Sequence, residues 1–328
     1  WLCAAMVAKR SLLNEVKAII PPLLPEFHKG QAGRVGVIGG SREYTGAPYY
    51  ASMSSMRLGC DMTFTICEPV AAATIKTYSP DLIVNPLLDE NRPVSEVRSV
   101  LQSLFGRMHS LVIGPGLGRD EHMQKFARVA IEAAREANLY LVIDADGLWL
   151  VQNAPETVRG YSRVVLTPNV VEFGRLCDQL QVDRRDPEQA AQRLCDALGG
   201  PTILEKGSVD RIVSPAGAAV CDVEGGLKRC GGQGDLLSGM LGTFLAWAKR
   251  YEERMASGSG PVLAVDKQEA PQIPTERLPL LAAYGAATVT RTTSNLGFRR
   301  LGRSMLANDL MDDIGQAYEK VFGLASHC

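Results

Sequence analysis

The segment from Gly225 to Asp235 combines glycines, a carboxylate and the start of a helix. It reads Gly-Gly-Leu-Lys-Arg-Cys-Gly-Gly-Gln-Gly-Asp, and the helix-forming residues 236–240 follow at once. Glycines let successive backbone N–H groups face one point, and the helix adds the partial positive charge of its N-terminus. Such a turn suits a phosphate group, and its carboxylate can accept a proton from a substrate hydroxyl. The competing interpretation is a glycine-rich turn in which Asp235 only caps the helix.

Two common nucleotide-binding motifs are missing from the sequence. The Walker pattern G-x-x-x-x-G-K-[ST] does not occur. Gly39-Gly40-Ser41 and Gly114-Pro115-Gly116-Leu117-Gly118 both follow apolar runs, but neither has the G-x-G-x-x-G spacing of a Rossmann site. A triphosphate is therefore expected against the turn that ends at Asp235.

Polar and glycine residues directly follow several short apolar runs rich in Val, Ile and Leu. Runs of this kind indicate strands of a parallel sheet that helices cover on both faces. In such sheets ligands bind beyond the carboxyl ends of the strands. We therefore expect one cleft to be lined by Gly39–Ser41, Gly114–Gly118, Asp144–Gly147, Thr167–Asn169 and Lys206-Gly207.

The alternation of apolar runs and amphipathic stretches predicts the elements that carry these turns. Strands are expected within 34–41 and at 63–67, 82–84, 111–114, 139–143, 164–166 and 202–204, with an edge hairpin at 209–214 and 218–222. Helices are expected before Pro21 and at 46–59, 70–77, 94–105, 120–137, 170–180, 235–250, 277–295 and 304–323. Since the alternation never pauses, residues 1–328 are predicted to form one domain, with a mobile surface loop at 252–276.

Composition excludes several classes of function. Hydrophobic residues make up 46% of the chain, which is enough for a large core. The chain has 35 basic and 36 acidic residues, so it lacks the excess of positive charge that is typical of nucleic-acid binding. The eight cysteines form no C-x-x-C pair, which favours free thiols over a zinc site. The sequence has no apolar run of about 18 residues, the length that would predict a membrane span. The chain begins at Trp1, so any upstream targeting signal is invisible, and the cytoplasm or mitochondria remain open as its compartment.

Several motifs in order resemble a known family. Residues 231–239 resemble the G-x-G-D anion-hole motif of ribokinase-like kinases. The similarity to the NAD(P)H-hydrate dehydratase family runs from about residue 15 to about residue 323 and is carried by segments 39–49, 112–120, 142–149 and 166–173. The Cys-Gly-Gly-Gln-Gly-Asp form is similar to the ATP-dependent eukaryotic branch. The resemblance implies a ribokinase-like three-layer α/β sandwich, with a mostly parallel central sheet and helices on both faces.

The resemblance also implies an activity. Members of this family are lyases that repair nicotinamide nucleotides: they dehydrate the S epimer of hydrated NADH or NADPH, with release of ADP and phosphate. ATP is the co-substrate, and Mg²⁺ is expected to bridge its phosphates. Family members often form homo-oligomers and are paired in function with an epimerase of the same hydrates. The hydrated cofactor is thus the expected small-molecule partner.

Residue roles follow from the resemblance position by position. Asp235 is the expected base for the C6 hydroxyl, with backbone N–H groups of Gly232, Gln233 and Gly234 as the anion hole. The expected contacts of the hydrated cofactor are Gly116, Gly118, Asn169, Val170, Val171, Glu172, Phe173, Gly174 and Arg175, besides Asp235. The expected ATP contacts are Lys206, Gly207, Ser208, Val209, Asp210, Gly225, Gly226, Leu227, Lys228, Arg229, Cys230, Gly231, Gly232, Gln233 and Gly234. The metal ligands stay unassigned.

Structural interpretations compete with these roles. Asn169 can be a helix cap, Glu172 a first-turn charge and Lys206 a solvated turn residue. Asp144 and Asp146 can cap the turn after their strand, and Cys230 is expected to be a packing residue. Two other functions stay open: a small-alcohol kinase of the same fold, such as a hydroxyethylthiazole or sugar kinase, and a nucleotide-binding protein without turnover.

Overall fold

A computed structural model describes residues 2–23, 25, 28–258 and 272–323 of the chain. In this part of the chain one sheet has the strand order β3-β2-β1-β4-β5-β6-β7-β8-β9. The strands are β1 (Arg34–Ile38), β2 (Met62–Ile66), β3 (Ile83–Asn85), β4 (Ser110–Ile113), β5 (Tyr140–Ile143), β6 (Val164–Leu166), β7 (Thr202–Glu205), β8 (Asp210–Ser214) and β9 (Gly217–Cys221). The neighbours from β3 to β7 pair in parallel, and β8 and β9 are antiparallel.

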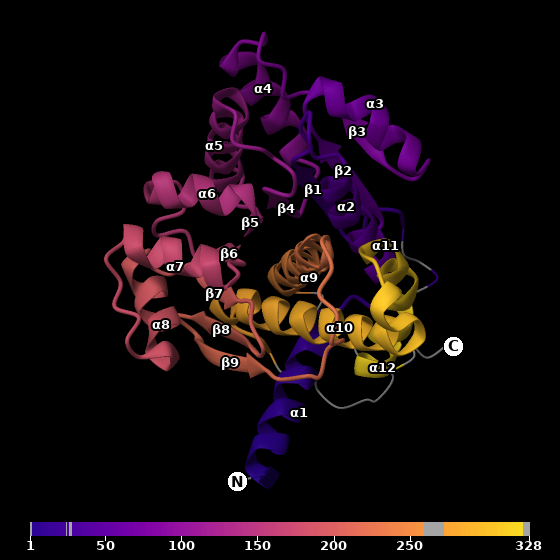
Figure 1. Ribbon diagram of the computed structural model, residues 1–328, viewed down its shortest axis with the longest axis vertical. Helices are drawn as coiled ribbons and strands as arrows, with labels where there is room; N and C mark the ends of the chain where they lie inside the picture. Colours follow the sequence, from indigo (N-terminus) through magenta and orange to yellow (C-terminus); the bar gives the residue numbers. More distant parts are fainter. Residues whose placement is uncertain (1, 24, 26–27, 259–271, 324–328) are drawn as a thin grey trace.

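Helices cover both faces of this sheet (Figure 1). They are α1 (Leu2–Ile19), α2 (Gly46–Leu58), α3 (Pro69–Tyr78), α4 (Val94–Phe105), α5 (Glu121–Glu136), α6 (Asp146–Asn153), α7 (Val170–Gln179), α8 (Pro187–Ala197), α9 (Gln233–Ala256), α10 (Leu278–Leu301), α11 (Ala307–Leu310) and α12 (Ile314–Phe322). Short 3₁₀ turns lie at Pro155–Thr157, Thr275–Arg277, Gly302–Ser304 and Met311–Asp313. No described helix is both long and apolar enough to cross a bilayer.

Alternation along the strands divides the core into two layers. Val112 of β4 packs into one hydrophobic cluster, while Leu111 and Ile113 pack into the other. The first cluster includes residues of α1, α2, α3, α9, α10 and α12, and the second includes residues of α4 to α8. Because successive strand side chains point to opposite faces, a run of apolar residues fills both clusters. The fold is therefore a three-layer α/β sandwich with a mostly parallel sheet, as the sequence predicts.

The predicted strands agree with the structure within one residue at each end, and the β8–β9 hairpin lies at the sheet edge. Two helices, α6 and α8, are absent from the elements that the sequence predicts. Helix α9 continues to Ala256, so residues 252–256 of the expected loop are helical. Tyr251 is 1% exposed and anchors this last part of the helix in the core. Residues 259–271 of that loop lie outside the described residues.

The expected helix at 304–323 is confirmed only in part, because two short helices and a 3₁₀ turn cover residues 307–322. Helix α10 continues to Leu301 and stops at Gly302, whose φ is 56°. The chain then restarts at α11, where the Asp309 carboxylate accepts a hydrogen bond of 2.8 Å from the Leu306 N–H. A 3₁₀ turn at Met311–Asp313 separates α11 from α12. The carboxylate contact thus fixes the start of α11 at Ala307, three residues later than the predicted start.

Candidate active site

A lysine and a buried aspartate meet beyond the carboxyl ends of the parallel strands. Lys206 follows β7, and its Nζ lies 2.8 Å from Oδ1 of Asp144, which follows β5. The side chains are 20% and 3% exposed. Asn169, after β6, forms an isolated parallel bridge with Lys206 and so brings the intervening strand end to the same place. The interpretation of Lys206 as a solvated turn residue is therefore wrong.

Asp235 faces this ion pair from the start of α9. It lies in the first turn, next to Gly234, where a Cβ atom would stand 3.5 Å from Lys206 Nζ and 3.9 Å from Asp144 Oδ2. Burial and the Asp144 carboxylate raise the pKa of Asp235 to about 7, although Lys206 acts in the opposite direction. A carboxyl group with a pKa near neutral pH can exchange a proton with a bound hydroxyl.

The start of α9 is shaped by a glycine in a left-handed conformation. Gly232 precedes the helix with φ 95° and ψ −17°. The first-turn N–H groups of a helix have no acceptor within it, and their positive end favours an anion. Asp235 is neither the residue that precedes the helix nor the acceptor of a capping bond, so its interpretation as a cap is wrong.

Replacing Gly232 with alanine is expected to destabilise the fold by about 1–3 kcal/mol. The new Cβ would lie 2.6 Å from the Ala307 Cβ and 3.0 Å from the Tyr50 ring, in a backbone conformation that alanine disfavours. Urea unfolding measures the loss. Gly231→Ala is the matched control, because a Cβ there meets nothing within 4 Å, and it should change stability by less than about 0.5 kcal/mol. Equal losses in the two variants would contradict this account.

The glycine loop after β4 is tied to the carboxylates through Asp146. The Gly118 N–H donates to Asp146 Oδ2 at 3.0 Å, and Gln124 Nε2 donates to the Gly118 carbonyl at 2.6 Å. Gly116 accepts a bond of 3.0 Å from the Gly40 N–H, so the turn after β1 joins the same edge. The segments predicted to converge do meet there.

Ala145, between the two aspartates of this edge, has an uncommon backbone. Its φ is 47° and its ψ is −120°, a conformation that costs a non-glycine residue on the order of 1–3 kcal/mol. This bend lets Asp144 pair with Lys206 while Asp146 turns to the Gly118 amide. Strain of this kind gathers where side-chain placement serves a function.

The segment 169–175 divides into capping, buried and cavity-lining residues. Asn169 Oδ1 accepts from the N–H groups of Val171 and Glu172, and Glu172 Oε2 accepts from the Asn169 N–H, so both form the capping box of α7. Phe173 and Gly174 are buried, and Val170 and Val171 are exposed. Phe173 therefore packs into the core and does not face the cleft.

A cavity of about 100 Å³ lies beside this segment. Glu172 and Arg175 line it together with Arg119, Ala145, Asp146, Leu148, Trp149 and Gln152. Arg119 bonds Asp146 and lies over the Trp149 ring, with 5.8 Å between the guanidinium carbon and the ring centroid. Burial raises the pKa of Glu172, although Lys206 opposes this shift. The cavity is thus lined by the ring of Trp149 and by both basic and acidic side chains.

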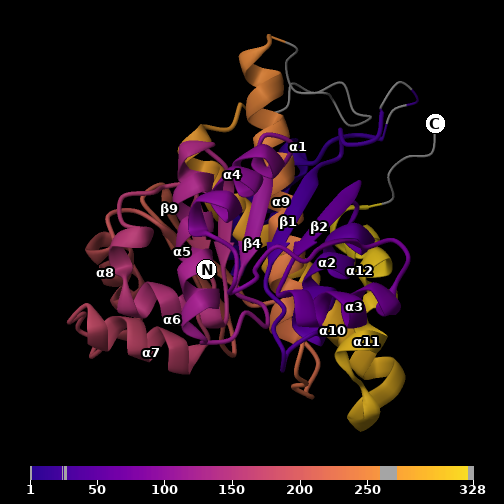
Figure 2. The same ribbon diagram turned by 90° about the horizontal axis from the view of Figure 1, so that it is seen from above.

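The two segments expected to hold ATP meet at α10. In the first, Asp210 is buried and its carboxylate pairs with Arg291, so that side chain faces α10. In the second, Gly226 is buried against α10, whereas Leu227 is 82% exposed. Figure 2 shows the loop that precedes α9 at the end of the molecule where α7 also lies. Burial raises the pKa of the partly buried Cys230 thiol, as a packing role requires.

The predicted residues do not include Trp149, Arg291 and Ser294, which contribute to the site. Asp144 and Asp146 belong to a segment that was expected to line the cleft, but the predicted site residues give them no role. For Asp144 and Asp146 the signal was their position after a strand. Arg291 and Ser294 carry no signal, because their partners lie 81 and 68 residues away in sequence. Among the described residues no three His, Cys, Asp or Glu side chains are close enough to hold a metal without further ligands.

Comparison with known proteins identifies the relatives of this chain. A family model described as NAD(P)H-hydrate dehydratase matches residues 35–315. An ATP-dependent (S)-NAD(P)H-hydrate dehydratase of Mycosarcoma maydis is 54% identical over 323 residues, which cover 96% of this chain and 89% of the relative. The enzyme of the same name from Schizosaccharomyces pombe is 49% identical, with 94% and 92% covered.

Solved structures show the same fold. A ribokinase-like superfamily protein from Enterococcus faecalis superposes with a TM-score of 0.70 at 20% identity, covering 94% of this chain and 95% of that one. The ADP/ATP-dependent NAD(P)H-hydrate dehydratase of Bacillus subtilis, co-crystallised with ATP and Mg²⁺, gives 0.62 at 20% identity, with 93% and 96% covered. The fold is thus ribokinase-like, and by the family model and its relatives this chain belongs to the NAD(P)H-hydrate dehydratase family.

Proposed function

We propose that this chain is a hydro-lyase that converts the S epimer of hydrated NADH or NADPH to NADH or NADPH, with ATP consumed to ADP and phosphate. The names of its relatives support this activity. The observation that carries it is Asp235, a carboxyl group with a pKa of about 7 in the first turn of a helix, beside Lys206. A proton acceptor and an anion-binding helix start are what phosphoryl transfer to a hydroxyl requires.

In the proposed first step, Asp235 takes the proton of the C6 hydroxyl. The hydroxyl oxygen then forms a bond to the γ-phosphorus of ATP, and ADP leaves with the electrons of the broken P–O bond. In the second step the C6–O bond breaks and phosphate takes its electron pair. The neighbouring ring carbon loses a proton, and the ring double bond forms again. Hydroxide is a poor leaving group and phosphate a good one, which explains why ATP is needed.

Contacts with the hydrated cofactor are proposed along the cavity beside α7. Glu172 and Arg175 line it, and Val170 and Val171 are exposed in the first turn of the same helix, α7. Gly116 and Gly118, at left-handed φ values of 61° and 75°, have no side chain that would cover the neighbouring surface. The γ-phosphate would then lie between Asp235 and the first-turn amides of α9.

Mg²⁺ fits the donor set of this site. The ion prefers oxygen ligands and usually binds one or two carboxylates together with substrate phosphates. Asp144 and Glu172 face Lys206 and offer such carboxylates, and a protein cage of three ligands is not required. When bound, the ion would neutralise charge on the transferred phosphoryl group. Asp144 and Glu172 would hold it at the phosphates.

A stoichiometric assay tests the proposed function. The protein is mixed with hydrated NADH and ATP, and both nicotinamide absorbance and inorganic phosphate are followed. We expect one phosphate for each NADH formed, and much slower turnover when ADP replaces ATP. A stable phosphorylated product without recovery of absorbance would instead indicate a small-alcohol kinase. No ATP consumption with any hydrated cofactor would favour a binding protein.

A further inference from the structure

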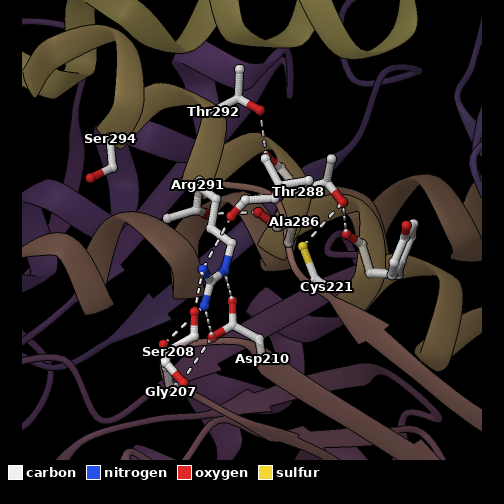
Figure 3. A network of polar contacts seen from close by, with 12 residues as sticks. Gly207, Ser208, Asp210, Cys221, Ala286, Thr288, Arg291, Thr292 and Ser294 are labelled. Carbon is white, nitrogen blue, oxygen red and sulfur yellow. Dashed lines mark hydrogen bonds and ion pairs between the residues drawn. The ribbon is translucent and has the colours of Figure 1, made fainter. Parts of the chain in front are cut away.

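Arg291 of α10 connects the first segment expected to hold ATP to Val223, which lies two residues before the second. Its guanidinium donates to the carbonyls of Gly207 and Ser208, both at 2.9 Å, and to the Val223 carbonyl at 3.2 Å. Figure 3 shows the side chain reaching from its helix to Gly207, Ser208 and Asp210. One side chain thus fixes the turn after β7 and the start of the loop after β9.

The remaining donors of Arg291 are taken by Asp210. Nε lies 2.6 Å from Oδ2, and the second terminal nitrogen lies 2.9 Å from Oδ1. Oδ1 also accepts from the Gly207 N–H at 3.0 Å, which closes the turn around the carboxylate. The Arg291 and Asp210 side chains are only 11% and 9% exposed. Every guanidinium N–H group is used, so Arg291 has none left for a phosphate.

Ser294, one turn further along α10, holds the glycine loop. Its Oγ accepts from the Gly226 N–H at 3.2 Å and from Gln233 Nε2 at 3.4 Å. A Cβ on Gly226 would lie 2.5 Å from the Ser294 carbonyl oxygen, so only glycine permits this approach. Gln233 Nε2 also reaches the Lys228 carbonyl at 3.3 Å. The loop between Gly226 and Gln233 is therefore fastened near both ends.

We propose that Arg291 and Ser294 are positioning residues of the ATP site, which set the backbone geometry of segments 206–210 and 225–234 without touching the nucleotide. The inference rests on the proposed function, because it takes ATP to bind these segments. If the pair of Arg291 and Asp210 served only the stability of the fold, the contact between guanidinium and carboxylate would be sufficient. Three backbone carbonyls of two separate segments converge on Arg291 in addition, and these contacts select one loop conformation.

Arg291→Lys is the decisive variant. Lysine keeps the positive charge but cannot reproduce the planar fork, so contacts to the loops are lost while the pairing with Asp210 is partly kept. We expect the KM for ATP and the equilibrium Kd of ATP to rise about tenfold or more. The KM for hydrated NADH should stay within about twofold, because its proposed contacts lie on other segments. Ser294→Ala should raise the KM for ATP by about three- to tenfold.

Arg163→Lys is the matched control. Arg163 forms a bond of 2.7 Å with Glu252, and their side chains are 19% and 13% exposed, but the pair lies where β6 begins, at the other end of the strands. This variant should lower the unfolding temperature and leave the KM for ATP unchanged. If Arg291→Lys does not fold, Ser294→Ala decides alone.

The outcomes separate the inference from the proposed function. Wild-type affinity for ATP in Arg291→Lys and Ser294→Ala overturns the inference alone. The inference is also overturned if the KM for ATP and the KM for hydrated NADH rise equally in Arg291→Lys while its unfolding temperature falls as much as that of Arg163→Lys. That pattern would indicate a general loss of stability. Failure of the wild-type protein to bind ATP overturns the proposed function and the inference together.

Discussion

Asp235→Asn is expected to lower kcat by about 10²- to 10⁴-fold while ATP still binds. The amide keeps the size of the side chain but cannot accept the hydroxyl proton. In the wild-type protein the base must be ionised, and its pKa is raised to about 7. The value of kcat/KM should therefore fall about tenfold for each pH unit below 7 and level off above it. Initial rates with hydrated NADH and ATP across pH measure both effects.

Thermal unfolding of the same variant excludes misfolding as the cause. The Asp235 pKa is about 7 in the folded protein against 3.8 for the unperturbed group, so the folded state holds the proton more tightly. Ionised Asp235 thus destabilises the fold as pH rises from about 4 to about 7. Asp235→Asn should be more stable than wild type above pH 7 and equal to it below pH 4. A pH step near 7 in its residual activity, or retention of wild-type kcat, would rule out Asp235 as the base.

Lys206→Met is expected to destabilise the fold by about 3–5 kcal/mol. The change leaves the Asp144 carboxylate, which is 3% exposed, without its cation. Lys206 also lowers the pKa of Asp235, so any remaining activity should require a higher pH. Urea unfolding at pH 8 measures the loss.

A second substitution tests the cause of that loss. Adding Asp144→Asn to Lys206→Met removes the unpaired charge and should restore most of the stability without restoring turnover. If Lys206→Met unfolded at the same urea concentration as the wild-type protein, the pair of Lys206 and Asp144 would contribute nothing to stability. An unrescued double variant would mean that packing of the lysine stem, rather than charge, is what stabilises the edge.

Local sequence patterns predict the sheet because the strands are short apolar runs bounded by glycine and polar turns. The strand ends after β1, β4, β5, β6 and β7 were expected to meet, and contacts such as Gly40 with Gly116 and Asp144 with Lys206 confirm it. Helices α6 and α8 were missed. Helix α6 has only eight residues and follows the strained Ala145, which gives no cap signal.

Side-chain partners could not be predicted in the same way. The pairing of Lys206 with Asp144 joins residues 62 apart, and that of Arg291 with Asp210 joins residues 81 apart. No local spacing encodes such pairs; they follow from the order of the strands and the path of α10. The resemblance predicts Asp210 at the nucleotide, whereas its carboxylate pairs with Arg291. The resemblance predicts which segments hold the nucleotide, and only the tertiary structure shows which way each side chain points.

Helix α10 follows the strands, the glycine loop and α9 in the chain, and this order has a consequence for synthesis. The strands, the glycine loop and α9 all leave the ribosome before Arg291 and Ser294, which hold that loop in place. Domains begin to fold as their N-terminal parts emerge, but a nascent chain that ends before α10 lacks the contacts that hold the glycine loop. A ligand stabilises only a form that it can bind. Under the proposed function, ATP would therefore protect from degradation only chains that include α10, and products truncated before this helix would gain no such protection.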